Sequence, residues 1–198
     1  MLRHKYFHHA GGYSLIELLV VISITSAIAV PLTLFSIKGL TSYAFLQAQS
    51  DTALELNTLA NRIAKVVRGT SSVDTAQPNT LTIYGYFSPQ DTVIKKIRYF
   101  IAGTNLNIGV TPPTGTAPNY TYDAATEVIT TTRIDLVMAG KPLFTYYDDA
   151  GNVLSGAFLT SQVKNVGLYV AANPSAKQVA VPISISTRVT LRNLKTNL

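Results

Sequence analysis

The apolar and polar positions of this chain follow two different patterns, which change near residue 69. Residues 13–37 form an apolar run with a single charged residue, Glu17, and residues 38–69 place apolar residues at spacings of three, four or seven. Such spacings are typical of an amphipathic helix. They predict one long helix over residues 13–68, apolar in its first half and amphipathic in its second half, which ends at Gly69.

Beyond residue 69 the chain alternates apolar and polar residues between clusters of turn-forming residues, which is typical of strands. The stretches with this pattern are residues 81–87, 93–102, 106–110, 127–137, 143–147, 166–171 and 179–191. Residues 70–198 are therefore expected to form an antiparallel β-rich domain that packs on the amphipathic part of the helix. The predicted fold class is α+β. Residues 111–122, which include three prolines, are expected to form an exposed loop.

The apolar run over residues 13–37 is long enough to cross a bilayer. Twelve of the residues from 18 to 37 are Leu, Ile, Val or Phe. Together they contribute roughly −5 kcal/mol to insertion, which outweighs the cost of roughly +3 kcal/mol for one charge at the bilayer centre. Arg3 and Lys5 precede the run and Lys38 follows it. The positive-inside rule favours a cytoplasmic N-terminus, so we expect a single-pass protein of the cytoplasmic membrane.

Composition narrows the chemistry that the chain can perform. Its 198 residues have a formal net charge of +6, no Cys and three His, which are His4, His8 and His9. The lack of Cys excludes disulfides, thiolate nucleophiles and Cys-ligated zinc or iron–sulfur sites. All three His lie within residues 1–12, so a chain without these residues has neither His nor Cys. We therefore expect no enzymatic activity, no cofactor and no metal site.

The densest acidic cluster, Asp148 and Asp149 before Gly151, has two interpretations. Its carboxylates could offer oxygen ligands to Ca²⁺, but the alternating acidic positions and the distal Glu of an EF-hand loop are absent. A hairpin turn with Gly151 at positive φ is the simpler interpretation.

Small residues precede the apolar run at positions 10–12, whereas an ordinary secretory signal has its small-residue cleavage site after the apolar core. A cut after Gly12 would remove a hydrophilic leader, residues 1–12, and leave the apolar helix on the mature chain. An isolated carboxylate such as Glu17 needs a partner in hydrocarbon, and the new α-amine of Tyr13 in a neighbouring copy could supply one. Alternatively, Glu17 lies at the headgroups and is favoured there by the helix dipole.

Residues 11–22, with the sequence GGYSLIELLVVI, resemble the prepilin signature of type IV pilins and type II secretion pseudopilins. The resemblance implies that a prepilin peptidase cuts between Gly12 and Tyr13 and that the same enzyme N-methylates Tyr13. It also implies that Glu17 takes the acidic position that guides subunits into the filament. Tyr13 departs from the family's usual Phe. A softer similarity to J-type pseudopilins and W-type minor pilins comes from residues 97–101, 144–152 and 189–193.

By this resemblance the chain is expected to be a structural subunit, a minor pilin or a pseudopilin, of a type IV pilus or a type II secretion-like filament. Residues 13–37 would lie first in the membrane and then in the core of a cell-surface or envelope filament, and residues 38–69 would continue the helix. The implied partners are the prepilin peptidase and methyltransferase, other pilin subunits through their N-terminal helices, the inner-membrane assembly platform and the membrane. Pro31 is expected to kink the helix and Gly39 to loosen it, either as a functional hinge that helps extraction from the bilayer or as a tolerated defect of a membrane helix.

The alternative function is a binding module at the tip of the filament, such as an adhesin or a DNA receptor, with the loop of residues 111–122 as its contact. Nucleic acid is left open as a partner, because tyrosines near cations could stack on bases while the cations contact phosphates. These residues are Tyr84, Tyr86, Tyr99 and Tyr120, with Lys95, Lys96 and Arg98. The alternative interpretation is strand-forming tyrosines and solvated cations.

Overall fold

A long helix and two antiparallel sheets make up the fold in the computed structural model, which describes residues 12–117, 119–133, 135–174 and 181–192. The helix is α1 (Leu15–Arg68), and two short 3-10 helices cover Ala124–Thr126 and Thr160–Gln162. The strands are β1 (Ser72–Gln77), β2 (Thr80–Gly85), β3 (Lys95–Ala102), β4 (Asn105–Thr111), β5 (Val128–Arg133), β6 (Phe144–Tyr147), β7 (Val153–Leu154), β8 (Asn165–Ala172) and β9 (Ile183–Thr190). This arrangement confirms the predicted α+β class.

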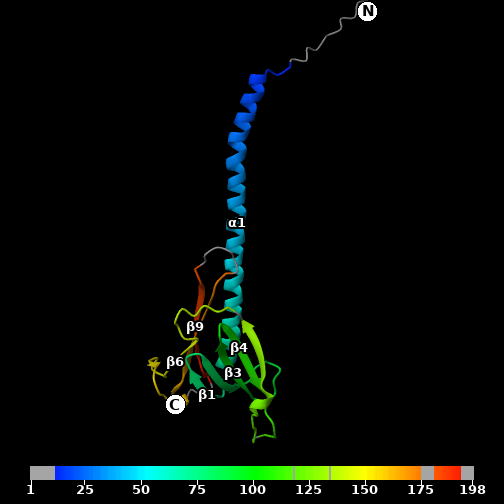
Figure 1. Cartoon of the computed structure of the whole chain (residues 1–198). Helices are drawn as coiled ribbons and strands as arrows, with labels where there is room; N and C mark the ends of the chain where they lie inside the picture. Colours follow the sequence, from blue (N-terminus) through cyan, green and yellow to red (C-terminus); the bar gives the residue numbers. More distant parts are fainter. Residues whose placement is uncertain (1–11, 118, 134, 175–180, 193–198) are drawn as a thin grey trace, which may run out of the picture. The chain divides into compact units, whose positions relative to one another are not determined.

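The chain divides into two units, Met1–Ala44 and Phe45–Leu198. The second unit contains both sheets, one with the strand order β1-β2-β3-β4-β5 and the other with the order β7-β6-β8-β9. Every strand in them pairs with its neighbours in antiparallel fashion. In Figure 1 these strands lie around the C-terminal part of α1, which belongs to the same unit.

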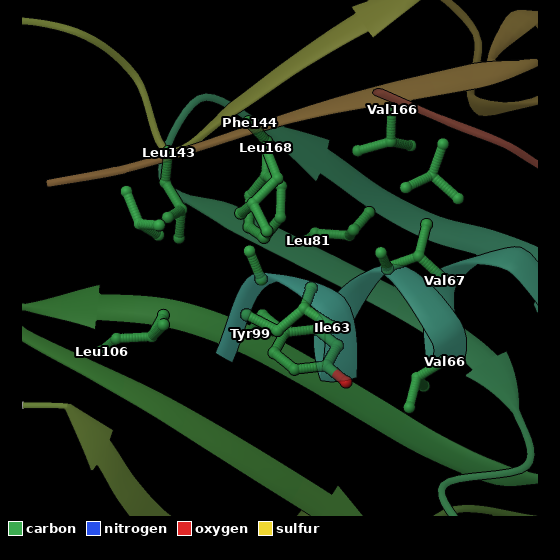
Figure 2. Close-up of a cluster of buried hydrophobic side chains, with 14 of the residues drawn as sticks. Ile63, Val66, Val67, Leu81, Tyr99, Leu106, Leu143, Phe144, Val166 and Leu168 are labelled. Atoms are coloured by element: carbon green, nitrogen blue, oxygen red, sulfur yellow. The ribbon is translucent and has the colours of Figure 1, made fainter. Parts of the chain in front are cut away.

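The amphipathic part of α1 packs on the sheets with the face that its apolar spacing predicts. The buried residues on this face include Thr52, Leu56, Leu59, Ile63 and Val66. Figure 2 shows Ile63 together with Tyr99 of β3 and Phe144 of β6, so side chains from the helix and from both sheets meet in one core. The core forms because burying these side chains removes apolar surface from water, at about 25 cal/mol per Å².

Each stretch with strand-like alternation contains a strand, but two strands lack that signal. β1 is mostly polar, with Val73 and Ala76 as its apolar residues, and β7 has only two residues, so neither produces a detectable alternation. The predicted strand over residues 127–137 is too long, because β5 ends at Arg133 and Asp135 has a φ of 56°, a left-handed conformation that a strand residue does not adopt. The predicted loop over residues 111–122 is also one residue too long, because Thr111 is buried as the last residue of β4.

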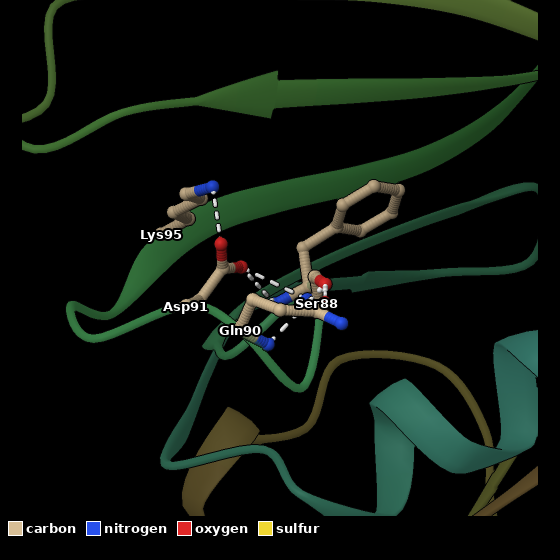
Figure 3. A network of polar contacts seen from close by, with 5 residues as sticks. Ser88, Gln90, Asp91 and Lys95 are labelled. Carbon is tan, nitrogen blue, oxygen red and sulfur yellow. Dashed lines mark hydrogen bonds and ion pairs between the residues drawn. The ribbon is translucent and has the colours of Figure 1, made fainter.

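The segment between β2 and β3 is held by the carboxylate of Asp91 (Figure 3). Asp91 accepts hydrogen bonds from the backbone N–H groups of Phe87 at 3.0 Å and Ser88 at 2.9 Å, and Lys95 donates to it at 2.6 Å. Burial works against the charged form of Asp91, but the hydrogen bonds from Lys95 and the backbone lower its pKa below the ordinary value of 3.8.

Acidification is expected to loosen this segment. Because the folded-state pKa of Asp91 is lowered, its stabilising contribution is present in full above the ordinary pKa of 3.8 and is lost as the pH falls below that value. The protection factors of the Phe87 and Ser88 amides against hydrogen exchange should therefore fall below about pH 4 by more than those of the amides in β8. In an Asp91→Asn variant the exchange of these amides should be fast already at pH 7, and equal protection in both proteins at pH 7 would contradict the assignment.

Candidate functional site

The predicted processing site lies in an exposed segment without regular structure. Gly12, Tyr13 and Ser14 precede α1, belong to no helix or strand, and are all exposed, with Tyr13 at 82%. Exposed segments outside regular structure are the preferred sites of proteolytic cleavage. The peptide bond between Gly12 and Tyr13 is therefore accessible in this conformation, and the rest of the predicted leader, residues 1–11, lies outside the described residues.

Ser14 and Glu17 together start helix α1. The Ser14 hydroxyl accepts a hydrogen bond from the backbone N–H of Glu17 at 3.2 Å, and the Ser14 carbonyl accepts one from Leu18 at 3.1 Å. Ser14 is thus the N-cap, and Ser-x-x-Glu is the sequence of a capping box. Reasoning from the sequence missed this cap, although the spacing of Ser14 and Glu17 signals it. The cap explains why the helix begins at Leu15, two residues later than predicted.

Glu17 lies in the first turn of α1 and is exposed. A carboxylate at this position interacts favourably with the positive end of the helix dipole, which is worth about 0.3–1 kcal/mol at an exposed site. Because the cap uses the backbone N–H of Glu17, its carboxylate remains available to a group outside the helix. Both interpretations of Glu17, as a dipole-stabilised interfacial residue and as a partner for a neighbouring amine, are compatible with this geometry.

The first part of α1 presents a continuous apolar surface. Within the described residues, α1 is the one helix long and apolar enough to cross a membrane, and none of its most apolar window is buried. Four of its hydroxyl groups are satisfied inside the helix, because Ser23, Thr25, Thr33 and Ser36 each donate to the carbonyl four residues earlier. Such bonds remove the cost of placing these hydroxyls in hydrocarbon.

α1 continues without a break through Pro31 and Gly39. Pro31 has no N–H to donate, so the carbonyl of Ala27 loses its usual helical partner at this turn. A side chain at Gly39 would meet no atom within 4 Å, so packing inside the chain does not require glycine there. A hinge at these two positions stays a prediction.

The expected surface of tyrosines and cations is only partly present. Tyr99 has 0% exposure and lies in the core, so its predicted place on a stacking surface was wrong. Neighbouring side chains of a strand point to opposite faces, and Tyr99 points to the inner face of β3 while Lys96 and Arg98 point to the outer one. The cations are engaged by carboxylates, with Lys95 on Asp91, Lys96 on Asp74 and Arg98 on Glu127. The hydrogen bond that Lys96 donates to the Asp74 carboxylate raises the pKa of Lys96. Phosphate groups would have to compete with these carboxylates.

Gly109 of β4 leaves room for the pair between Arg98 and Glu127. Glu127 accepts two hydrogen bonds from Arg98, at 2.8 and 2.5 Å, and a Cβ at position 109 would lie 1.9 Å from its carboxylate oxygen. Gly109→Ala is therefore expected to displace the carboxylate and lower the free energy of unfolding by about 1–2 kcal/mol. In a Glu127→Ala background the same change should cost about 1 kcal/mol less, as measured by chemical denaturation. Equal costs in the two backgrounds would contradict this role of Gly109.

The acidic cluster near Gly151 forms the predicted hairpin turn. Gly151 has a φ of 89°, and the Asn152 backbone and side-chain N–H groups both donate to the Asp148 carboxylate. These hydrogen bonds lower the pKa of Asp148. Each oxygen of the Asp148 carboxylate therefore accepts a hydrogen bond within the turn. In the described part of the chain, no three His, Cys, Asp or Glu side chains gather closely enough to hold a metal ion.

Fold and site together define an α+β protein whose N-terminal helix is long and apolar enough to cross a membrane and whose second unit is an antiparallel β domain. No protein-family model matches the chain, and no curated protein matches it either.

Proposed function

We propose that this chain is a structural subunit, a minor pilin or a pseudopilin, of a type IV pilus or a type II secretion-like filament. It would be stored in the cytoplasmic membrane with its N-terminus in the cytoplasm, cut between Gly12 and Tyr13 by a prepilin peptidase, and N-methylated on Tyr13. The inner-membrane assembly platform would then add it to a filament through its N-terminal helix.

One observation carries the proposal: an exposed, unstructured Gly12–Tyr13 bond lies directly before a capped helix that has Glu17 in its first turn and an uncovered apolar surface beyond it. Cleavage there creates a positive amine close to a carboxylate. In a filament, the amine of one copy and the Glu17 carboxylate of the next would pair in a low-dielectric environment, where an unpaired charge is strongly unfavourable.

Under this proposal the apolar surface of residues 18–35 has two roles, first as a membrane anchor and then as part of the filament core. In the membrane it contacts lipid, and in the filament it would be buried against equivalent helices of neighbouring subunits. Small side chains allow helices to approach closely, and several lie in this segment. They are Ser23, Ser26, Ala27 and Ala29. Transfer from lipid to filament would then cost little free energy, because one apolar environment replaces another.

Intact mass measurement with N-terminal sequencing of the native protein tests the proposal. We expect a chain that begins at Tyr13 and carries one methyl group on its α-amine. A native chain that still begins with Met1 would contradict both the processing and the assembly route.

A binding module at the filament tip is the second candidate, and the loop after β4 favours it. Thr114 and Thr121 exchange two backbone hydrogen bonds, at 2.8 and 3.0 Å, so this exposed loop is held in a defined conformation. Replacing residues 112–121 with an unrelated linker should leave filaments unchanged but abolish adhesion or DNA uptake if the loop binds a ligand. Unchanged adhesion and uptake would exclude that role for the loop.

A further inference from the structure

A pocket with a polar lining lies on the outer face of the five-stranded sheet, within the second unit. Side chains from β1, β2, β3 and β4 line it, together with side chains from the segment between β4 and β5. Its volume is ≈ 410 Å³, which is in the range of small-molecule sites. We call it the polar pocket, and its polar side chains include Asp74, Thr82, Lys96, Arg98, Thr111 and Glu127.

The charged groups of the polar pocket compensate one another. Lys96 lies 3.1 Å from the Asp74 carboxylate, and Arg98 lies 2.5 Å from the Glu127 carboxylate. The lining thus holds two cations and two carboxylates in two ion pairs, so its formal charge is balanced. An anionic ligand would have to displace the carboxylates, and a metal ion would have to displace the cations. This arrangement therefore favours an uncharged ligand.

Two threonine hydroxyls in the polar pocket have no partner inside the described part of the chain. Thr82 is 3% exposed and Thr111 is 4% exposed, and neither hydroxyl makes a hydrogen bond to another described residue. Across the strand pairs, Thr82 lies opposite Arg98 and Thr111 lies opposite Lys96, so each threonine adjoins a cation of the pocket. A buried hydroxyl without a partner is unfavourable. Because neither hydroxyl is fully enclosed, a partner can reach both through the pocket.

We propose that the polar pocket binds an uncharged polyhydroxylated ligand, namely a hexose unit of a carbohydrate. Sugar hydroxyls both donate and accept, so one ring can donate to the carboxylates while it accepts from the cations and hydrogen-bonds to the threonine hydroxyls. Tyr122 also lines the pocket, and its ring packs against the ring of Tyr84 with centroids 5.0 Å apart. The aromatic ring offers an apolar surface to the C–H groups of a sugar ring.

The inference goes beyond the proposed function, because the polar pocket lies wholly within the second unit and does not involve the N-terminal helix segment that would enter a filament. A carbohydrate site on the β domain would give a single subunit a ligand of its own, without any contact between copies of this chain. Binding can therefore be measured on the purified protein, whatever its route of processing or assembly.

Ligand-observed NMR with the purified full-length chain tests the proposal, in a detergent without a sugar headgroup so that the detergent does not compete. The probes are glucose, galactose, mannose and N-acetylglucosamine as free sugars, dextran as a soluble polysaccharide, and inorganic phosphate as the charged alternative. We expect saturation transfer from the protein to at least one neutral probe, and transfer to dextran but not to glucose would identify a polysaccharide as the source of the hexose unit. No transfer to any of the neutral probes, or phosphate binding as tight as sugar binding, would overturn the proposal.

Thr82→Val and Thr111→Val separate ligand binding from a structural role. Valine keeps the shape of threonine without its hydroxyl, so each variant should weaken sugar binding by about five- to tenfold. The midpoint of chemical denaturation should stay the same or rise, because an unpaired buried hydroxyl has been removed. Thr145→Val makes the same change on β6 in the other sheet and should leave binding unchanged. Unchanged binding in both pocket variants, or an equal loss in Thr145→Val, would overturn the proposal.

Glu127→Gln tests the balance of charge. It leaves Arg98 without a carboxylate, so the polar pocket of this variant should bind inorganic phosphate, more weakly as salt rises, while sugar binding falls. Phosphate that binds the unchanged chain as well as the variant would overturn the preference for a neutral ligand. Because binding is measured on purified protein, a native chain that still begins with Met1 contradicts the proposed function alone, whereas a processed chain that binds none of the neutral probes contradicts the carbohydrate site alone.

Discussion

Replacing Glu17 with Gln is expected to stop this chain from entering filaments while cleavage after Gly12 continues. The amide keeps the size of the side chain, but it cannot pair with the positive amine of Tyr13 in a neighbouring copy. Removing one partner of a buried ion pair leaves the other charge uncompensated, at a cost of about 3–5 kcal/mol, which corresponds to a loss of incorporation of about hundredfold or more. The amount of chain in sheared filaments, relative to the processed chain in membranes, measures the effect.

Glu17→Gln also separates pairing from capping. Gln serves as well as Glu at the third position of a capping box, so a purely local role of Glu17 at the helix start predicts a normal Glu17→Gln variant. Ser14→Ala is the reciprocal control: it removes the cap that Ser14 provides to Glu17, at a cost of about 1 kcal/mol to the helix start, but keeps the carboxylate. We expect Ser14→Ala to enter filaments. Normal entry of Glu17→Gln, or failure of Ser14→Ala alone, would contradict the pairing mechanism.

Leu56→Ala is expected to have the largest effect on the stability of the second unit. Leu56 has 0% exposure and lies on the face of α1 that packs against the sheets. Truncating a buried leucine removes apolar contacts and leaves a cavity, at a cost of about 2–5 kcal/mol. The free energy of unfolding of the full-length chain in detergent can be followed by its tyrosine signal, since the chain has 11 Tyr and no Trp.

Leu54→Ala is the matched control on the same helix. Leu54 lies only two residues away but is 68% exposed, so its truncation should change the free energy of unfolding by no more than about 0.5 kcal/mol. Equal destabilisation by the two substitutions would show that α1 does not pack on the sheets through the face that contains Leu56.

Much of the fold could be predicted because the local signals are strong and agree. The end of α1 follows from Gly69 and a basic last turn, and the buried face follows from the spacing of Leu56, Leu59 and Ile63. β1 could not be predicted, because most of its residues are polar and its two apolar residues, Val73 and Ala76, do not alternate regularly; its pairing with β2 is visible only in the folded chain. The end of β5 could not be predicted either. The strand stops before Asp135, which has a left-handed φ, and no neighbouring residue type indicates this conformation.

The candidate site also has one part that the sequence predicts and one part that depends on the fold. The bond between Gly12 and Tyr13, Glu17 and the apolar run are contiguous in the chain, so their pattern is visible without a fold. The surface of tyrosines and cations depends instead on which face of a strand each side chain occupies and on carboxylates that are distant in sequence. Glu127 reaches Arg98 across 29 positions, and such a partner has no local signature.

The sequence by itself determined the long helix with its apolar and amphipathic halves, the β-rich domain after residue 69, and the motif of small residues, Glu17 and the apolar run near Gly12. Each of these depends on residues that are close together in the chain. Only the tertiary structure decided that Tyr99 is buried, that Lys95, Lys96 and Arg98 are occupied by carboxylates, and that Asp51, Arg62 and Lys65 are not. The physical reason is that a charge or an aromatic ring is available for binding only where the folded chain leaves it exposed and unpaired, and pairing across strands is set by long-range packing.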